Sequence, residues 1–168
     1  MQYRRLSRGR ILFALAAFVC ACSTRAGRIL AKDGATQYRV VTPATPSPAD
    51  GLAAQELATF LTRSTGAEFV IVTESELPAG TPGLYVGQTE FAEREGIDFA
   101  SFGREESLTL TTGDDIVFCG GQPRGALYAV YDFLEKELGC LWLDERTEIV
   151  PRLDALEVGR IKARRQPA

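Results

Sequence analysis

The sequence has 168 residues, 45% of them hydrophobic and 24% charged, which is the composition of a folded domain rather than of a disordered chain. Its formal net charge of −3 argues against nucleic-acid binding, because phosphate contacts need a basic face. The sequence contains no histidine, which excludes Ser-His-Asp and Cys-His nucleophile pairs and His-ligated zinc within the chain. Only carboxylates are left for acid and base chemistry, and no metal or cofactor site is predicted.

The N-terminus has the charged, apolar and small-residue order of a secretory signal. Four arginines precede the apolar run over residues 11–19, and without them the net charge of the remainder is −7, since −3 minus 4 is −7. The run holds nine residues, whereas a helix that spans a bilayer needs about 20. Residues 1–21 are therefore predicted to be a signal peptide, and the protein is expected to be exported.

Two cysteines follow the apolar run. Residues 19–23 (VCACS) resemble a bacterial lipoprotein box, in which a small residue precedes the acylated cysteine. Cys22 fits better than Cys20, because Ala21 precedes Cys22 whereas the bulky Val19 precedes Cys20. The resemblance implies a lipidated Cys22 and a membrane-anchored lipoprotein of the periplasm or cell surface. An ordinary signal peptide with incidental cysteines is the alternative.

The next residues predict a tether and then a domain in which strands and helices alternate. Residues 22–36 lack sustained periodicity and suit a tether, and residues 37–42 (QYRVVT) have strand composition. A helix is predicted next, because Ser47 can cap it, Pro48 suits its first position and Gly66 can end it. Further elements are expected as short strands over residues 68–73 and 84–87 and a polar helical stretch over residues 90–95.

The second half of the domain begins with a predicted hairpin. Strands over residues 107–111 and 116–119 are joined by a turn at Gly113. The second main helix is predicted over residues 124–138, with apolar residues at helical spacing and Gly139 after it. The last short strands are expected over residues 140–143, 147–150 and 156–158.

These elements predict one layered α/β domain over residues 37–158. Its sheet is expected to be mixed, with four to six strands and the two main helices packed on it. The basic residues 159–168 (GRIKARRQPA) are predicted to be a linker to a following domain.

A glycine-rich turn lies between the predicted strand and the second main helix. Residues 120–125 (GGQPRG) occupy a context in which glycine loops can hold phosphate, but their spacing matches neither the dinucleotide fingerprint nor the P-loop. A tight turn that uses the positive φ open to glycine is therefore predicted. Arg124 lies at a helix N-terminus, where the dipole disfavours a cation, so a carboxylate partner is expected, with ligand contact as the alternative.

The acidic residues that could form a catalytic pair lie at surface spacing in predicted helices. Asp132 and Glu135 belong to the second main helix, and Glu90, Glu93 and Glu95 to the polar helical stretch. Glycoside hydrolysis needs two carboxylates on opposite sides of a bound sugar. Solvated helix faces explain these groups, so no catalytic residue is predicted.

Trp142 and the two later cysteines are predicted to be structural. Trp142 lies between Leu141 and Leu143, which favours a core position over a sugar-stacking platform. A domain-interface or ligand contact of Trp142 is the alternative. Cys119 and Cys140 flank a helix that would separate them by about 20 Å, beyond the reach of a disulfide. Both are expected to be buried and unpaired.

Several of these segments together resemble a known domain. Residues 116–143 (IVFCGGQPRGALYAVYDFLEKELGCLWL), followed by EIVP at residues 148–151, resemble the N-terminal domain of family 67 α-glucuronidases. Residues 54–66 (AQELATFLTRSTG) and 84–87 (LYVG) are similar to a helix and a strand of that domain. A weaker likeness holds to the second domain of family 20 β-N-acetylhexosaminidases.

The resemblance covers roughly residues 38–158 and implies a supporting role. It identifies the chain as the non-catalytic N-terminal domain of an exported polysaccharide-degrading glycoside hydrolase. In such enzymes the acid and base carboxylates lie in a C-terminal catalytic barrel, which would follow residues 159–168 and is missing here. The alternative is a stand-alone exported module that binds plant or bacterial polysaccharide.

Overall fold

A six-stranded mixed β-sheet forms the centre of the protein. The computed structural model describes residues 27–144 and 147–167, so the predicted signal peptide and Cys22 lie outside the described residues. In sheet order the strands are β10 (Lys162–Arg165), β5 (Ser107–Thr112), β6 (Asp115–Gly120), β4 (Gly83–Val86), β2 (Arg39–Thr42) and β3 (Ile71–Thr73). The strands β2, β3, β4 and β6 run parallel to their neighbours in that set, whereas β5 is antiparallel to both β6 and β10.

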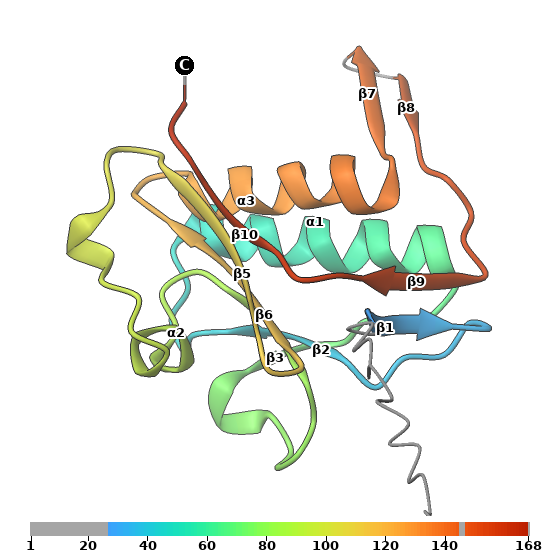
Figure 1. Cartoon of the computed structure of the whole chain (residues 1–168), viewed down its shortest axis with the longest axis horizontal. Helices are drawn as coiled ribbons and strands as arrows, with labels where there is room; N and C mark the ends of the chain where they lie inside the picture. The colour runs from blue at the N-terminus through green and yellow to red at the C-terminus, as the bar shows by residue number, and fades with distance from the viewer. Residues whose placement is uncertain (1–26, 145–146, 168) are drawn as a thin grey trace, which may run out of the picture.

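Two long helices lie side by side along one face of the sheet (Figure 1). The first, α1, spans Pro48–Thr65, and its N-terminus is capped as predicted, since Oγ of Ser47 accepts a hydrogen bond from the backbone N–H of Asp50. It ends at Gly66, whose φ of 73° is the left-handed conformation that stops many helices. Both ends were predictable because capping is a local interaction.

The second long helix changes its winding near its end. The helix α3 spans Gly125–Phe133 and continues into the π-helical segment η3 (Leu134–Leu138), where the sequence predicted one helix over residues 124–138. Gly139 ends it with a φ of 75°. α3 packs against α1, β5 and β6. The predicted layered α/β fold, with two main helices on a mixed sheet, is confirmed.

Alternate residues of the central strands fill two cores. Val40 and Leu84 are fully buried on the helical face, together with apolar residues of α1 and α3. The next residues along each strand, Val41 and Tyr85, belong to a smaller core on the opposite face. That face is covered by short segments, among them α2 (Glu90–Arg94) and η2 (Phe99–Ser101), and by Leu77, which follows η1 (Glu74–Glu76).

The prediction of a tether is wrong for its second half. β1 (Arg28–Lys32) pairs antiparallel with β9 (Ala155–Val158), and these two strands form a separate small sheet. Leu30 and Ala31 are buried in the main core. Residues 28–32 therefore belong to the domain. Local composition misses this strand because its pairing partner lies at the other end of the chain.

The prediction of a linker over residues 159–168 is also wrong for residues 162–165. Residues 162–165 form β10, which pairs with β5 and completes one edge of the main sheet. The charge-rich sequence KARR has little strand character of its own. This strand forms because β5 pairs with it, and the local sequence alone does not predict it.

A third sheet is a two-stranded hairpin that projects from the body of the protein (Figure 1). It consists of β7 (Leu141–Asp144) and β8 (Thr147–Ile149), close to the predicted short strands. Within residues 27–144 and 147–167, none of the helices combines the length and the apolar character needed to cross a bilayer.

Candidate functional site

The glycine turn between β6 and α3 is a close contact between two stretches of backbone. A Cβ atom on Gly120 would lie 2.0 Å from the carbonyl oxygen of Glu106, and one on Gly121 would lie 1.8 Å from the carbonyl oxygen of Gly103. Neither glycine, nor Gly125, has a positive φ. The prediction that these glycines serve a positive φ is therefore wrong. They are needed because residues 103–106 occupy the space beside them.

Arg124 has the carboxylate partner that its position at the start of α3 predicted. Its Nε donates to Oε1 of Glu105 at 2.8 Å, and its guanidinium carbon lies 5.3 Å from the centre of the Tyr128 ring. The hydrogen bond from Arg124 lowers the pKa of Glu105 below its ordinary value. The described contacts of Arg124 thus fasten the loop before β5 to α3.

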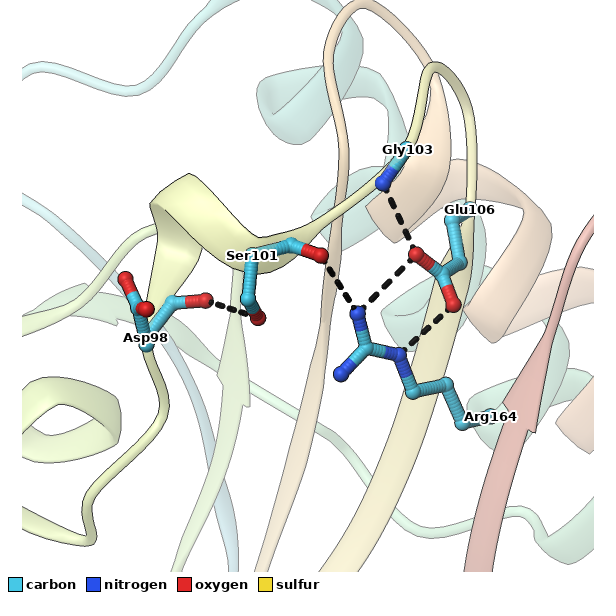
Figure 2. Close-up of polar contacts among 5 residues, drawn as sticks. All are labelled: Asp98, Ser101, Gly103, Glu106 and Arg164. Atoms are coloured by element: carbon cyan, nitrogen blue, oxygen red, sulfur yellow. Dashed lines mark hydrogen bonds and ion pairs between the residues drawn. The ribbon is translucent and has the colours of Figure 1, made fainter.

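A second arginine binds the neighbouring carboxylate (Figure 2). Arg164 of β10 donates from Nε to Oε1 of Glu106 at 2.6 Å and from its terminal nitrogen to Oε2 at 3.0 Å. The same nitrogen donates to the carbonyl oxygen of Ser101, and the N–H of Gly103 donates to Oε2 of Glu106, both at 2.8 Å. These bonds, the one from Arg164 first, lower the pKa of Glu106. Only 7% of the Glu106 side chain is exposed, so this carboxylate is a structural anchor.

Asp132, predicted to lie on a solvated helix surface, is instead half-buried and paired. It accepts a hydrogen bond from Lys136 one turn along the helix, and Arg165 of β10 lies 3.2 Å from its second oxygen. Glu135 is exposed. Two of the basic residues assigned to the linker, Arg164 and Arg165, therefore bind acidic residues of the domain.

Trp142 is neither a core residue nor a free platform. Its ring lies edge-on to Phe60 of α1, with centroids 5.3 Å apart, and to Tyr131 of α3, at 5.1 Å. The residue is still 38% exposed. Trp142 is therefore only partly buried, and the prediction of a core position is only partly right. The reason is that β7 belongs to a projecting hairpin, and the helices cover only one face of it.

The other face of the ribbon is aliphatic and exposed. Leu141 and its cross-strand neighbour Ile149 are each 46% exposed, and Leu143 is 63% exposed. Side chains alternate between the faces of a strand, so Leu141 points away from the side on which Trp142 meets the helices. We call Leu141, Leu143 and Ile149 the hairpin patch.

A hollow of about 800 Å³ opens beside β1, at a place where the sequence predicted only a tether. Its walls come from β1 and the turn after it, from the loop before β4 and from the β5–β6 turn. The Tyr38 hydroxyl donates to the carbonyl oxygen of Asp114 at 3.0 Å, and Oδ1 of Asp115 accepts from the N–H of Gly83 at 2.7 Å. We call this feature the β1 hollow. Sequence reasoning missed it because the residues that form its β1 wall were predicted to be a tether.

The two cysteines of the described residues are structural. Cys119 and Cys140 are buried and free, as predicted. Burial raises the pKa of the Cys119 thiol to about 12. Across the part of the chain that the structure describes, no three Cys, Asp or Glu side chains gather in a way that could hold a metal ion.

The fold is similar to part of a known glycoside hydrolase. No sequence model of a protein family matches the chain, and a comparison with curated protein sequences finds no match. Among solved structures, a similar one is BtGH115A, a family GH115 4-O-methyl-α-glucuronidase with specificity for decorated arabinogalactans. The TM-score is 0.57 at 12% identity, over 82% of this chain and 18% of that enzyme. The likeness shows a shared fold, and the resemblance to families 67 and 20 stays a prediction.

Proposed function

We propose that the chain is the non-catalytic domain of an exported, α-glucuronidase-like glycoside hydrolase that degrades polysaccharide, and that it supports a catalytic barrel outside this sequence. The fold that it shares with a stretch of a much longer α-glucuronidase supports the proposal. So does the resemblance of residues 116–143 to the family 67 domain. The hairpin patch is the observation that carries it.

The hairpin patch has the character of a surface that another protein domain covers. Half of the exposed large hydrophobic residues in the described chain lie on this one hairpin, namely Leu141, Trp142, Leu143 and Ile149 among eight. A two-stranded ribbon is only marginally stable in water unless it packs against something. Clustered exposed apolar side chains mark contacts with proteins, membranes or ligands. The barrel is the partner that the proposal assigns to it.

Three carboxylates of the described residues serve the structure, which supports the non-catalytic role. Glu105, Glu106 and Asp132 are all bound by arginines. Asp114 and Asp115 are the acids that line the β1 hollow, and both come from one turn and therefore one wall. Glycoside hydrolysis requires carboxylates that flank the scissile bond from two sides.

The docking role can be tested with the chain and the catalytic barrel expected in the same reading frame. When the two are mixed as separate polypeptides, we expect them to associate, and Leu143→Lys to weaken their affinity at least tenfold, or about 1.4 kcal/mol. Val70→Lys is the matched control, because Val70 is also exposed but lies next to β3. A reading frame without a barrel, or equal effects of the two lysines, would count against the proposal.

Export and anchoring are proposed from the N-terminal sequence. We expect the mature protein to begin at an acylated Cys22 and to partition into detergent with the membrane fraction. Cys22→Ala should abolish lipid labelling and release the protein, whereas Cys20→Ala should leave both unchanged. Lipid labelling that survives Cys22→Ala would show that the anchor is elsewhere.

A further inference from the structure

The walls of the β1 hollow are fixed by contacts between distant parts of the chain. The guanidinium of Arg28 donates twice to the carbonyl oxygen of Gly113, at 2.8 and 2.5 Å, and once to that of Gly159 at 3.1 Å. These bonds hold the β5–β6 turn against β1. The wall that carries Asp114 and Asp115 is therefore preformed, as in most small-molecule sites.

The lining is rich in hydrogen-bond acceptors. Oδ1 of Asp115 accepts a hydrogen bond from the N–H of Gly83, and the second carboxylate oxygen can accept one from a ligand. The Tyr38 hydroxyl donates to the backbone carbonyl oxygen of Asp114, and its oxygen can still accept a hydrogen bond. Asp114 adds an exposed carboxylate. A ligand that donates several hydrogen bonds fits these acceptors.

The charges that line the hollow largely offset one another, which favours a neutral ligand over a strongly charged one. Asp114 and Asp115 face one amine, that of Lys32, while Glu95 and Arg28 act on Asp115 from outside the lining with opposite signs. Apolar contact is supplied by Ile29. A volume of about 800 Å³ lies within the range of small-molecule pockets.

We propose that the β1 hollow binds a neutral oligosaccharide. Neutral sugars combine many O–H donors with apolar C–H faces and carry no charge, which matches this lining. The proposal goes beyond the supporting role of the domain and does not depend on a catalytic barrel. The β1 hollow and the hairpin patch share no residue, so sugar binding and domain docking can fail separately.

The proposal is tested by calorimetric titration of the full chain with neutral tetrasaccharides of xylose, galactose and glucose. We expect at least one of them to bind. Thr81→Trp, which places a large ring in the wall, should abolish that binding, and Asp114→Asn should weaken it about fivefold, because a hydrogen bond to a charged acceptor is the stronger one. The matched controls are Thr45→Trp and Asp154→Asn, exposed residues that do not line the hollow.

Three results would overturn the proposal. The first is that none of the neutral tetrasaccharides binds. The second is that a charged ligand binds more tightly than the neutral sugars, whether it is calcium ion, spermine or an oligosaccharide that bears uronic acid. The third is that Asp114→Asn, a change in an exposed turn that should fold normally, leaves the affinity equal to that of its control.

Discussion

Glu106 and Arg164, 58 positions apart, meet in a two-pronged ion pair that fastens the last strand of the sheet to the loop before β5. The same loop is held on its other side by the pair of Glu105 and Arg124. Two adjacent glutamates thus connect β10 and α3 through one short stretch of backbone. The predictions below start from this junction.

The ion pair between Glu106 and Arg164 should make the free energy of unfolding depend on pH. The ordinary pKa of Glu106 is 4.5, and its folded value is lower because of the bonds from Arg164 and Gly103. Its contribution is therefore complete above pH 4.5 and is lost as the pH falls through the lowered folded value. We expect Glu106→Gln to reduce the free energy of unfolding at pH 7, and this deficit to shrink as the pH falls from 4.5. Urea unfolding at a series of pH values measures it.

The control for that experiment is Glu68→Gln, which alters an exposed glutamate before β3. It should leave the stability nearly unchanged at every pH. A deficit for Glu106→Gln that is the same at pH 3 and pH 7 would show that the ionised carboxylate is not what matters.

Two glycines should respond to alanine in opposite ways. Gly121→Ala places a Cβ against the backbone of Gly103 and should destabilise the protein by about 1–3 kcal/mol through overpacking. Gly51→Ala, inside α1 with nothing within 4 Å, should stabilise it by about 0.4–1 kcal/mol. Chemical denaturation measures both. Stability gained from Gly121→Ala would contradict the close approach described here.

The buried thiols should be protected in the native state. Burial raises the pKa of Cys119 to about 12 and also raises that of Cys140, so neither is a thiolate at pH 8. We expect alkylation by iodoacetamide at pH 8 to spare both in buffer and to modify both in urea, as mapped by mass spectrometry. Rapid labelling of Cys119 without denaturant would contradict its burial.

The anchoring of the hairpin can be followed through Trp142, the one tryptophan of the sequence. Tyr131→Leu removes an edge contact with its ring and should cost about 0.5–1.5 kcal/mol, with a red shift of the tryptophan emission. Tyr131→Phe keeps the ring and loses only the hydrogen bond to Glu56, so the emission should stay in place. Identical emission spectra for the two variants would contradict the contact between the Tyr131 and Trp142 rings.

The parts of the fold that sequence could predict are those fixed by local interactions. Ser47 and Gly66 predict the two ends of α1. The β5–β6 hairpin is predicted by two strand-like segments on either side of a glycine turn. The partner of Arg124 was predictable in kind, because a cation at a helix N-terminus needs a carboxylate. Its identity, Glu105, required the fold.

The parts that sequence could not predict depend on pairing between distant segments. Ile29 pairs with Glu157 and Arg164 pairs with Leu108, and in each case one strand is too polar or too short to show a strand pattern of its own. The strand β1, placed by the first pairing, forms one wall of the β1 hollow. The hollow was therefore missed together with β1.

The two outer strands of the main sheet differ in a way that bears on solubility. An edge strand presents unpaired backbone groups that can recruit another chain, and natural sheets oppose this with charge and with short strands. On one side, β10 carries Lys162, Arg164 and Arg165, so an incoming strand would meet like charges if it came from a second copy. On the other side, β3 has three residues and offers little length for a partner to pair with. The basic side chains of β10 thus oppose edge-to-edge pairing, and two of them, Arg164 and Arg165, also bind acidic residues of the domain.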